Sequence, residues 1–206
     1  MRALLVWTRV HRIGAASLIV GVSMAWAILD HGGAVERITV SILPIPSPLL
    51  AAALAGFGAS IGLVGPHVPV AERLRLAVAR AAWALALVMG LACVVAASGL
   101  VGASLRPQNV VMLTDPVNVV AMIRNAGLFF ALATASALAW GPALSWTVPL
   151  AYLVASLQLG GSEQTPAWWA MVRENDHVTW QLYVVGFAVA LAGAWYVARR
   201  RGLTTA

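Results

Sequence analysis

The side chains that could bind a metal or a haem, or transfer protons, are few in this sequence. It contains four histidines, one cysteine and seven acidic residues. Haem inside a membrane needs axial ligands, usually histidine, within the apolar helices. The histidines instead lie between or at the ends of apolar segments: His11, His31, His67 and His177. No HExxH, CxxC or carboxylate pair inside an apolar segment occurs. We therefore expect no catalytic, cofactor-binding or metal-binding residue, and a protein that is not an enzyme.

Other chemistry lacks a required residue. Ser60, in GFGASIG, resembles a nucleophile context, but no histidine accompanies it inside an apolar segment, and such a nucleophile needs a neighbouring base. All thirteen basic residues are arginine, so the chain has no Walker-A lysine for a nucleotide site of its own. No Asp or Glu lies well inside an apolar segment, which argues against proton- or sodium-coupled carriers. Energy from ATP would have to come from a separate ATPase.

The elements that carry these residues are apolar segments. Of the 206 residues, 61% are hydrophobic and 10% charged, whereas roughly 25% are charged in an average soluble domain. A membrane-spanning helix needs roughly 20 mostly apolar residues. Six segments meet this need: 13–29, 48–65, 81–103, 116–140, 143–159 and 178–198. We expect one all-α polytopic membrane domain over 1–206 with six transmembrane helices. The net charge of +6 is too thinly spread for a nucleic-acid partner.

The fourth segment has two interpretations. Thr114 or Asp115 caps a helix that has Pro116 at its first position, which places Arg124 more than two turns inside, near the outer third of the span. Alternatively, residues 110–123 lie on the outer surface and the span begins near Arg124. We favour the first. An arginine at that depth must snorkel, pair or face water.

The distribution of arginine predicts the orientation, because cytoplasmic loops are richer in Arg and Lys. With both termini in the cytoplasm of a bacterial plasma membrane, nine arginines lie inside: Arg2, Arg9, Arg12, Arg73, Arg75, Arg80, Arg199, Arg200 and Arg201. Four lie outside: Arg37, Arg106, Arg124 and Arg173. Glu72 is then the one inside acid, and the other six acidic residues fall outside.

Two segments that we expect in the cytoplasm are not predicted to cross the membrane. Residues 1–12, MRALLVWTRVHR, combine apolar and basic residues, which predicts an interfacial helix; the alternative is a charged leader that only sets orientation. Residues 65–80, GPHVPVAERLRLAVAR, form the longest cytoplasmic connection. We expect a partner-docking loop here or, with nearly equal weight, a basic loop that only fixes topology.

A third segment that is not expected to span the membrane, GGSEQTPAWWAMVRENDHVT at 160–179, is expected on the outer side. Thr165 before Pro166 is a helix-start signal, so we expect a brief helix dipping into the outer leaflet, followed by a polar turn that contains His177. Trp168 and Trp169 are interpreted mainly as interface anchors, with contact to a substrate as the alternative. In the second span, Gly58 and Gly62 have GxxxG spacing, which permits close helix approach.

Several of these stretches together resemble the membrane subunit of an ABC-2-type ABC exporter, in particular the short actinobacterial permeases. The stretches are the MRALLVWTRVHR leader, ERLRLAVAR, the pair Arg124–Asn125, and SWTVPLAYLVASLQLGG leading to PAWWA. The resemblance implies that Glu72, Arg73 and Arg75 couple to the ATP-binding subunit. It also implies that Pro166 to Val172 belong to a short outer re-entrant helix pair between spans five and six. The proline-rich first outer loop, HGGAVERITVSILPIPSP, departs from the family.

The expected function follows from this resemblance. Two permease chains, alike or different, pair around a central path above two cytoplasmic ATP-binding cassette subunits, which bind the ATP and magnesium. The cargo would be a peptide, lipid or drug-like molecule, and the outer or substrate-path residues would be Arg124, Trp168, Trp169 and His177. The alternatives are a non-transporting anchoring subunit of a membrane complex and, less favoured, a membrane redox subunit.

Overall fold

The computed structural model describes residues 13–29, 47–63, 85–86, 88–98, 100–101, 116–161, 167–172 and 178–202. Within these ranges the regular structure is helical apart from one bridge residue at Gly161, so the all-α class is confirmed for the part described. The helices are α2 (Ile13–Leu29), α3 (Ser47–Leu63), α6 (Pro116–Trp140), the 3₁₀ turn η2 (Pro142–Leu144), α7 (Thr147–Leu159) and α8 (Val178–Gly202). A further apolar helix covers Val88–Ser98.

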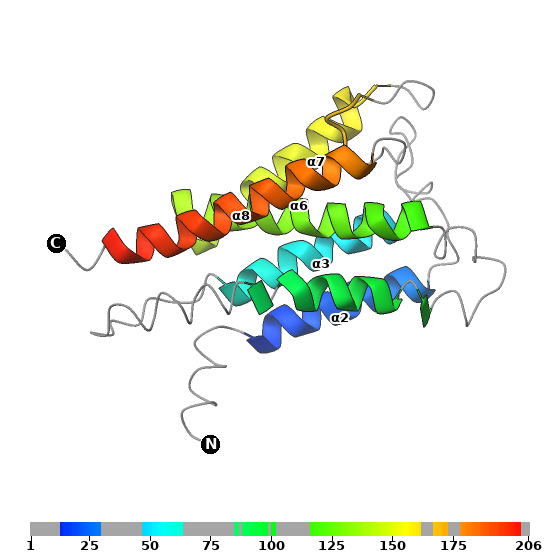
Figure 1. Cartoon of the computed structure of the whole chain (residues 1–206), viewed down its shortest axis with the longest axis horizontal. Helices are drawn as coiled ribbons and strands as arrows, with labels where there is room; N and C mark the ends of the chain where they lie inside the picture. Colours follow the sequence, from blue (N-terminus) through cyan, green and yellow to red (C-terminus); the bar gives the residue numbers. More distant parts are fainter. Residues whose placement is uncertain are drawn as a thin grey trace, which may run out of the picture.

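The helices form a bundle in which α6 is central (Figure 1). The main contacts run from α2 to α3, from α3 to α6 and from α6 to α8. Helix α7 and η2 also pack on α6, and Ser98 at the end of the Val88–Ser98 helix donates a hydrogen bond to Met24 Sδ of α2. Leu49, Met122 and Phe130 are among the largest fully buried side chains of the core. Helix α6 therefore touches most of the bundle.

Two glycines allow α3 to lie close to both of its neighbours. A Cβ atom built on Gly56 would lie 1.9 Å from the carbonyl oxygen of Ala126 in α6, and one on Gly58 would lie 2.6 Å from Ile19 Cγ2 in α2. Any larger residue at Gly56 would push the α6 backbone away. The close approach predicted for Gly58 is confirmed; the surroundings of Gly62 lie outside the described side chains.

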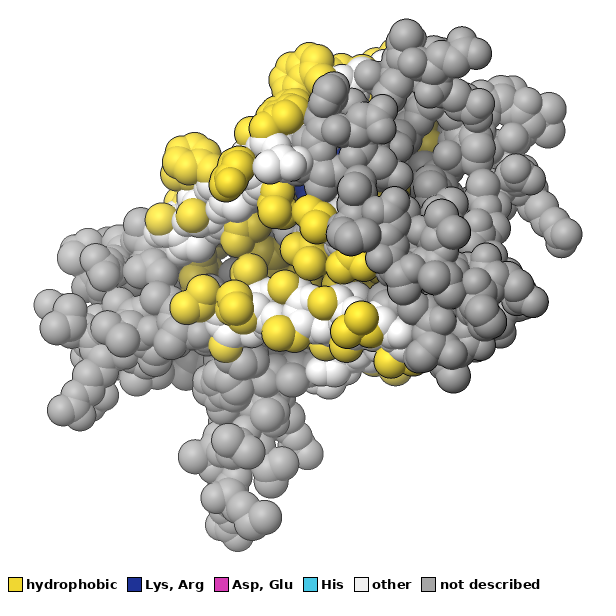
Figure 2. All heavy atoms as spheres, turned by 45° about the vertical axis from the view of Figure 1, so that its right-hand side comes forward, with side chains coloured by type: hydrophobic (Ala, Val, Ile, Leu, Met, Phe, Trp, Pro, Cys, Tyr) yellow, Lys and Arg dark blue, Asp and Glu magenta, His cyan; other side chains and the backbone are white. Residues whose placement is uncertain are grey.

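Two helices in the described ranges, Val119–Trp140 and the η2–α7 stretch Pro142–Leu159, are long and apolar enough to cross a membrane. Three others are apolar but shorter: Gly14–Trp26, Leu49–Ile61 and Val88–Ser98. The described surface is mostly hydrophobic in the view of Figure 2. A membrane crossing by all six segments stays a prediction.

The helix that starts at Pro116 continues without interruption to Trp140, in agreement with the first interpretation of the fourth segment. The fifth segment, predicted at 143–159, agrees with the apolar stretch Pro142–Leu159, within which the 3₁₀ turn η2 comes first and α7 begins at Thr147. Gly141 has φ 98°, in the left-handed region, and Pro142 follows it in a 3₁₀ turn. The carbonyl of Leu144 accepts hydrogen bonds from the hydroxyls of Ser136 and Thr147, at 2.6 and 2.7 Å, so the connection is a fixed corner.

Candidate functional site

The most polar place in the described core surrounds Arg124, in the third turn of α6. Its side chain is completely buried. The guanidinium Nε donates a hydrogen bond to Asn125 Oδ1 at 3.1 Å, Nη1 donates to Gln181 Oε1 of α8, and Nη2 donates to the carbonyl oxygen of Met171. The planar fork of five N–H donors explains how one side chain reaches three oxygens in different directions. The expected depth of Arg124 inside the helix agrees with this burial.

The two amide side chains extend the network to other elements. Asn125 is fully buried, and its Nδ2 donates to the carbonyl of Leu49 in the first turn of α3 at 3.5 Å. Gln181 is also fully buried, and its Nε2 donates to the carbonyl of Trp168 at 3.1 Å. Each amide thus accepts from Arg124 on one side and donates to a backbone carbonyl on the other, so α3, α6 and α8 are joined through side chains.

The 167–172 segment receives most of these bonds. Tyr152 of α7 donates its hydroxyl hydrogen to the carbonyl of Trp169 at 2.8 Å and accepts from the N–H of Met171 at 2.9 Å. Together with the bonds from Gln181 and Arg124, three carbonyls of this segment are held by one side chain each from α6, α7 and α8. The segment is fixed to three helices at once.

The end of α7 directs the chain into this position. Helix α7 ends at Leu159, and Gly161 has φ 83°, which turns the backbone. The N–H of Ala167 donates to the carbonyl of Gly160 at 2.8 Å. A Cβ on Gly160 would lie 2.8 Å from the Cβ of Ala170, so the close return of the 167–172 segment onto α7 depends on glycine there.

The brief helix expected over Pro166–Val172 is wrong for the described part of that range. Residues 167–172 form two successive turns, with one turn hydrogen bond from Ala170 to Ala167. Helical bonds would need the segment's carbonyls, but those of Trp168, Trp169 and Met171 accept side-chain donors instead. Neither helix of the expected outer re-entrant pair is present in the described ranges; 162–166 and 173–177 lie outside them.

The two tryptophans of this segment lie differently. Trp168 is 62% exposed, and its ring lies beside that of Trp180 of α8, with ring centroids 5.9 Å apart. Trp169 is half-buried. An exposed ring above a bound carbonyl suits the interface-anchor interpretation of Trp168. The remaining predicted site residues, Glu72, Arg73, Arg75 and His177, lie outside the described residues, as does the expected interfacial helix at 1–12.

Sequence reasoning did not single out Tyr152 and Gln181 as site residues. The signal was present, because polar side chains inside apolar segments face the interior of a bundle or a water-filled space. Arg124 itself was found in this way. The described part of the chain holds no group of three or more His, Cys, Asp and Glu side chains placed to bind a metal. An arginine stays protonated at any ordinary pH, so Arg124 acts as a hydrogen-bond donor. The network therefore binds backbone carbonyl oxygens.

No protein-family model, curated protein or solved structure matches this chain. The resemblance to ABC-2-type permeases therefore stays a prediction from the sequence.

Proposed function

We propose that this chain is the transmembrane permease subunit of an ATP-driven ABC exporter and that it pairs with a second permease chain. The observation that carries the proposal is Arg124, fully buried in an apolar helix and bonded to α8 and to the 167–172 segment. An ionisable residue inside a membrane helix is costly, faces the bundle interior and marks a functional site. An arginine that links two helices and a connecting segment makes this the part of the described bundle in which we expect a functional site.

The membrane placement is supported by the surface of the outer helices. Leu150 and Val154 on α7 and Phe187 and Leu191 on α8 are all exposed, and lipid is the environment in which such side chains lose nothing by exposure. In this placement six helices span a bacterial plasma membrane, both termini are cytoplasmic, and the 167–172 segment lies at the outer face. Arg124, Trp168, Trp169 and His177 are then near the outer end of the path for a peptide, lipid or drug-like cargo.

The energy comes from a separate chain in this proposal. No lysine is available for a Walker-A site, so ATP and magnesium are bound by a cytoplasmic ATP-binding cassette subunit. The 65–80 loop, with Glu72, Arg73 and Arg75, is the docking surface for that subunit. It is the longest predicted cytoplasmic connection, and it carries side chains of both negative and positive charge.

The test is purification of the tagged full-length chain from membranes of its own host. We expect a soluble ATPase to co-purify, and either Glu72→Arg or Arg75→Glu, each made alone, to remove it. Glu36→Arg, an equal charge change in the predicted outer loop, is the control and keeps the ATPase bound. An ATPase retained after both inner changes contradicts the docking assignment.

A non-transporting anchoring subunit is the second candidate, favoured by the exposed apolar side chains of α7, which a neighbouring subunit in a larger complex could cover. The same preparation separates the two functions after reconstitution into vesicles. A permease subunit supports ATP-dependent movement of a solute across the membrane and ATPase activity that the solute stimulates. An anchoring subunit binds its partners and shows neither.

A further inference from the structure

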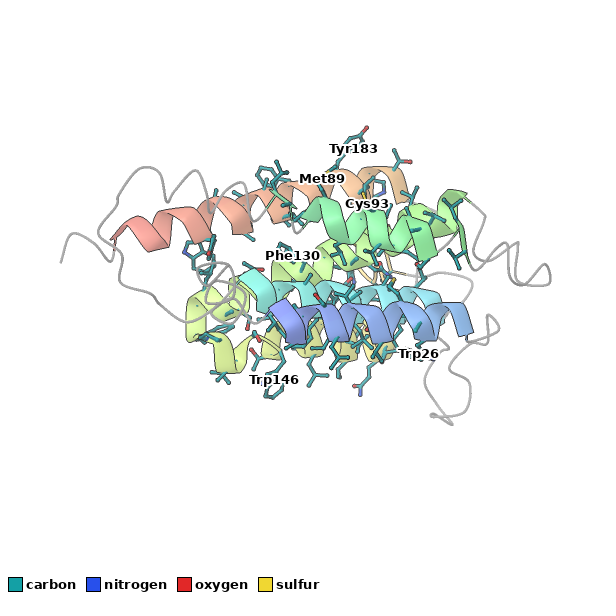
Figure 3. All side chains as sticks on the ribbon, turned by 90° about the horizontal axis from the view of Figure 1, so that it is seen from below. Trp26, Met89, Cys93, Phe130, Trp146 and Tyr183 are labelled. Atoms are coloured by element: carbon teal, nitrogen blue, oxygen red, sulfur yellow. The ribbon has the colours of Figure 1, made fainter. Side chains whose placement is uncertain are left out.

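An apolar cavity of about 240 Å³ lies between the Val88–Ser98 helix, α6 and α8. Its walls come from Leu91 and Ala92, from Ile123 and Phe130, and from Leu182 and Val189, and every residue that lines it is apolar or glycine. Figure 3 shows Met89 and Cys93 of the Val88–Ser98 helix and Tyr183 of α8 on the same side of the molecule. The cavity is separate from the hydrogen-bonded network, although Ile123 and Leu182 directly neighbour Arg124 and Gln181 in the chain.

The cavity exists because the helices present small residues to one another there. Ala126 and Gly127 of α6 line it together with Gly186 of α8. A Cβ atom built on Gly186 would have no atom within 4 Å, so this wall is open space. Protein interiors are close-packed, and an empty apolar space forfeits the dispersion contacts of its lining. The described residues leave this space unfilled, so it has room for an occupant that is not among them.

The shape and surroundings identify the chemistry of the occupant. Lining residues on α6 run from Ile123 to Phe130, two helical turns or about 10 Å along the axis, so the cavity is elongated parallel to the helices. Of the lining residues, Gly186 is exposed and Val88 and Ala92 are half-buried, so the cavity opens to the surface between the Val88–Ser98 helix and α8. A long aliphatic chain lying parallel to the helices fits both features.

We propose that this cavity binds one acyl chain of a bilayer phospholipid, which enters sideways between the Val88–Ser98 helix and α8. The inference rests on the proposed placement of the bundle in a membrane, where acyl chains and spanning helices lie side by side. A bound chain would contact Ile123 and Gly127 of α6, which are half-buried, beside Arg124, which holds the 167–172 segment.

The test uses a phospholipid with a diazirine in its acyl chain, reconstituted into vesicles with the full-length protein. After irradiation, mass spectrometry locates the labelled residues. We expect labels on Ile123 and Gly127, which bulk lipid does not reach in a bundle centred on α6. Leu150 and Val154 of α7 serve as positive controls, because they are exposed on the outside and any surrounding lipid reaches them.

Filling the cavity gives the matched comparison. Gly186→Leu places a side chain in the open space, and we expect a several-fold loss of labelling at Ile123 and Gly127 with α7 labelling unchanged. Gly193→Leu lies two turns further along α8, where a Cβ also meets nothing within 4 Å, and should leave every label unchanged. Ala92→Leu fills the cavity from the opposite wall and repeats the test if Gly186→Leu does not fold.

Each other outcome overturns the proposal. Labelled α7 with unlabelled α6 means that no acyl chain enters, as when a second copy of the chain occupies the space. Equal labelling of α6 in the filled and control variants means that access does not depend on the cavity. If neither helix is labelled, the membrane placement itself fails, which distinguishes failure of the proposed function from failure of this site.

Discussion

Helix α6 and the η2–α7 stretch are both long and apolar enough to cross a membrane, yet the protein packs them in opposite ways. In α6, 61% of an 18-residue window is buried, against 11% in the η2–α7 stretch. Helix α6 contacts α3, α7 and α8, whereas the main contact of α7 is with α6. Apolar composition therefore identifies both helices as candidate spans without saying which one organises the bundle.

The polar residues make the distinction. Helix α6 carries Arg124 and Asn125, both completely buried and bonded to three other elements. Helix α7 is anchored chiefly through Tyr152, whose ring meets Phe129 edge-on at 6.0 Å and whose hydroxyl bonds the 167–172 segment. In both helices a polar side chain thus lies on the face that is turned toward the bundle. The polar pair of α6 bonds to more elements than Tyr152 of α7 does, and α6 also packs against more helices.

The largest expected effect comes from removing the guanidinium in α6. Arg124→Met leaves the oxygens of Asn125, Gln181 and Met171 without this donor, and unpaired buried acceptors cost roughly 1–3 kcal/mol each. We expect a loss of about 3 kcal/mol or more in the free energy of unfolding, measured by thermal unfolding of the purified protein. Arg124→Lys should not restore stability, because an ammonium group cannot match the planar fork.

The control for this change is Val154→Met on α7, a substitution of an exposed residue to the same side chain. It should leave the unfolding temperature nearly unchanged. If the two variants unfold at the same temperature, the buried network does not set α6 apart from α7, and the comparison between the two helices is wrong.

The second effect tests how tightly α6 is held by α3. Gly56→Ala places a methyl group against the backbone carbonyl of Ala126, which cannot move aside as a flexible side chain can. We expect a loss of about 2–3 kcal/mol from the forced separation of the two helices. Gly193→Ala, in open space on α8, is the control and should be neutral or slightly stabilising, since alanine favours helix over glycine. Equal stability of both variants would show that α3 and α6 do not pack at this distance.

The third effect concerns the anchor of α7. Tyr152→Phe removes the acceptor of the Met171 N–H and the donor to the Trp169 carbonyl, and we expect a cost of about 1–2 kcal/mol. The specific readout is hydrogen exchange at Met171, which should become faster. The amides of Ala167 and Ala170 bond to backbone carbonyls and should change less. Tyr183→Phe, at an exposed position, is the control. Unchanged exchange at Met171 would contradict the role given to Tyr152.

The sequence predicted the helices better than their connections and contacts. Pro116 and the preceding capping residues indicate where α6 begins, and the helix does begin there, because such signals act within a single turn. The turns at 167–172 depend on distant partners. Arg124 lies 47 residues from Met171 and 57 from Gln181, and Asn125 lies 76 from Leu49. Sequence patterns within one or two helical turns do not predict contacts between residues this far apart in the chain. The orientation and the coupling residues Glu72, Arg73 and Arg75 stay predictions.

The smallest expected effect is on the exposed face of α7, where Leu150 and Val154 are 47 and 43% exposed. Val154→Ala removes two methyl groups that have few partners within the chain, so the isolated chain should lose less than about 0.5 kcal/mol, as at most surface positions. A loss in the isolated chain as large as that of Gly56→Ala would instead mean that α7 is packed as α6 is. The contrast between the two helices would then not exist.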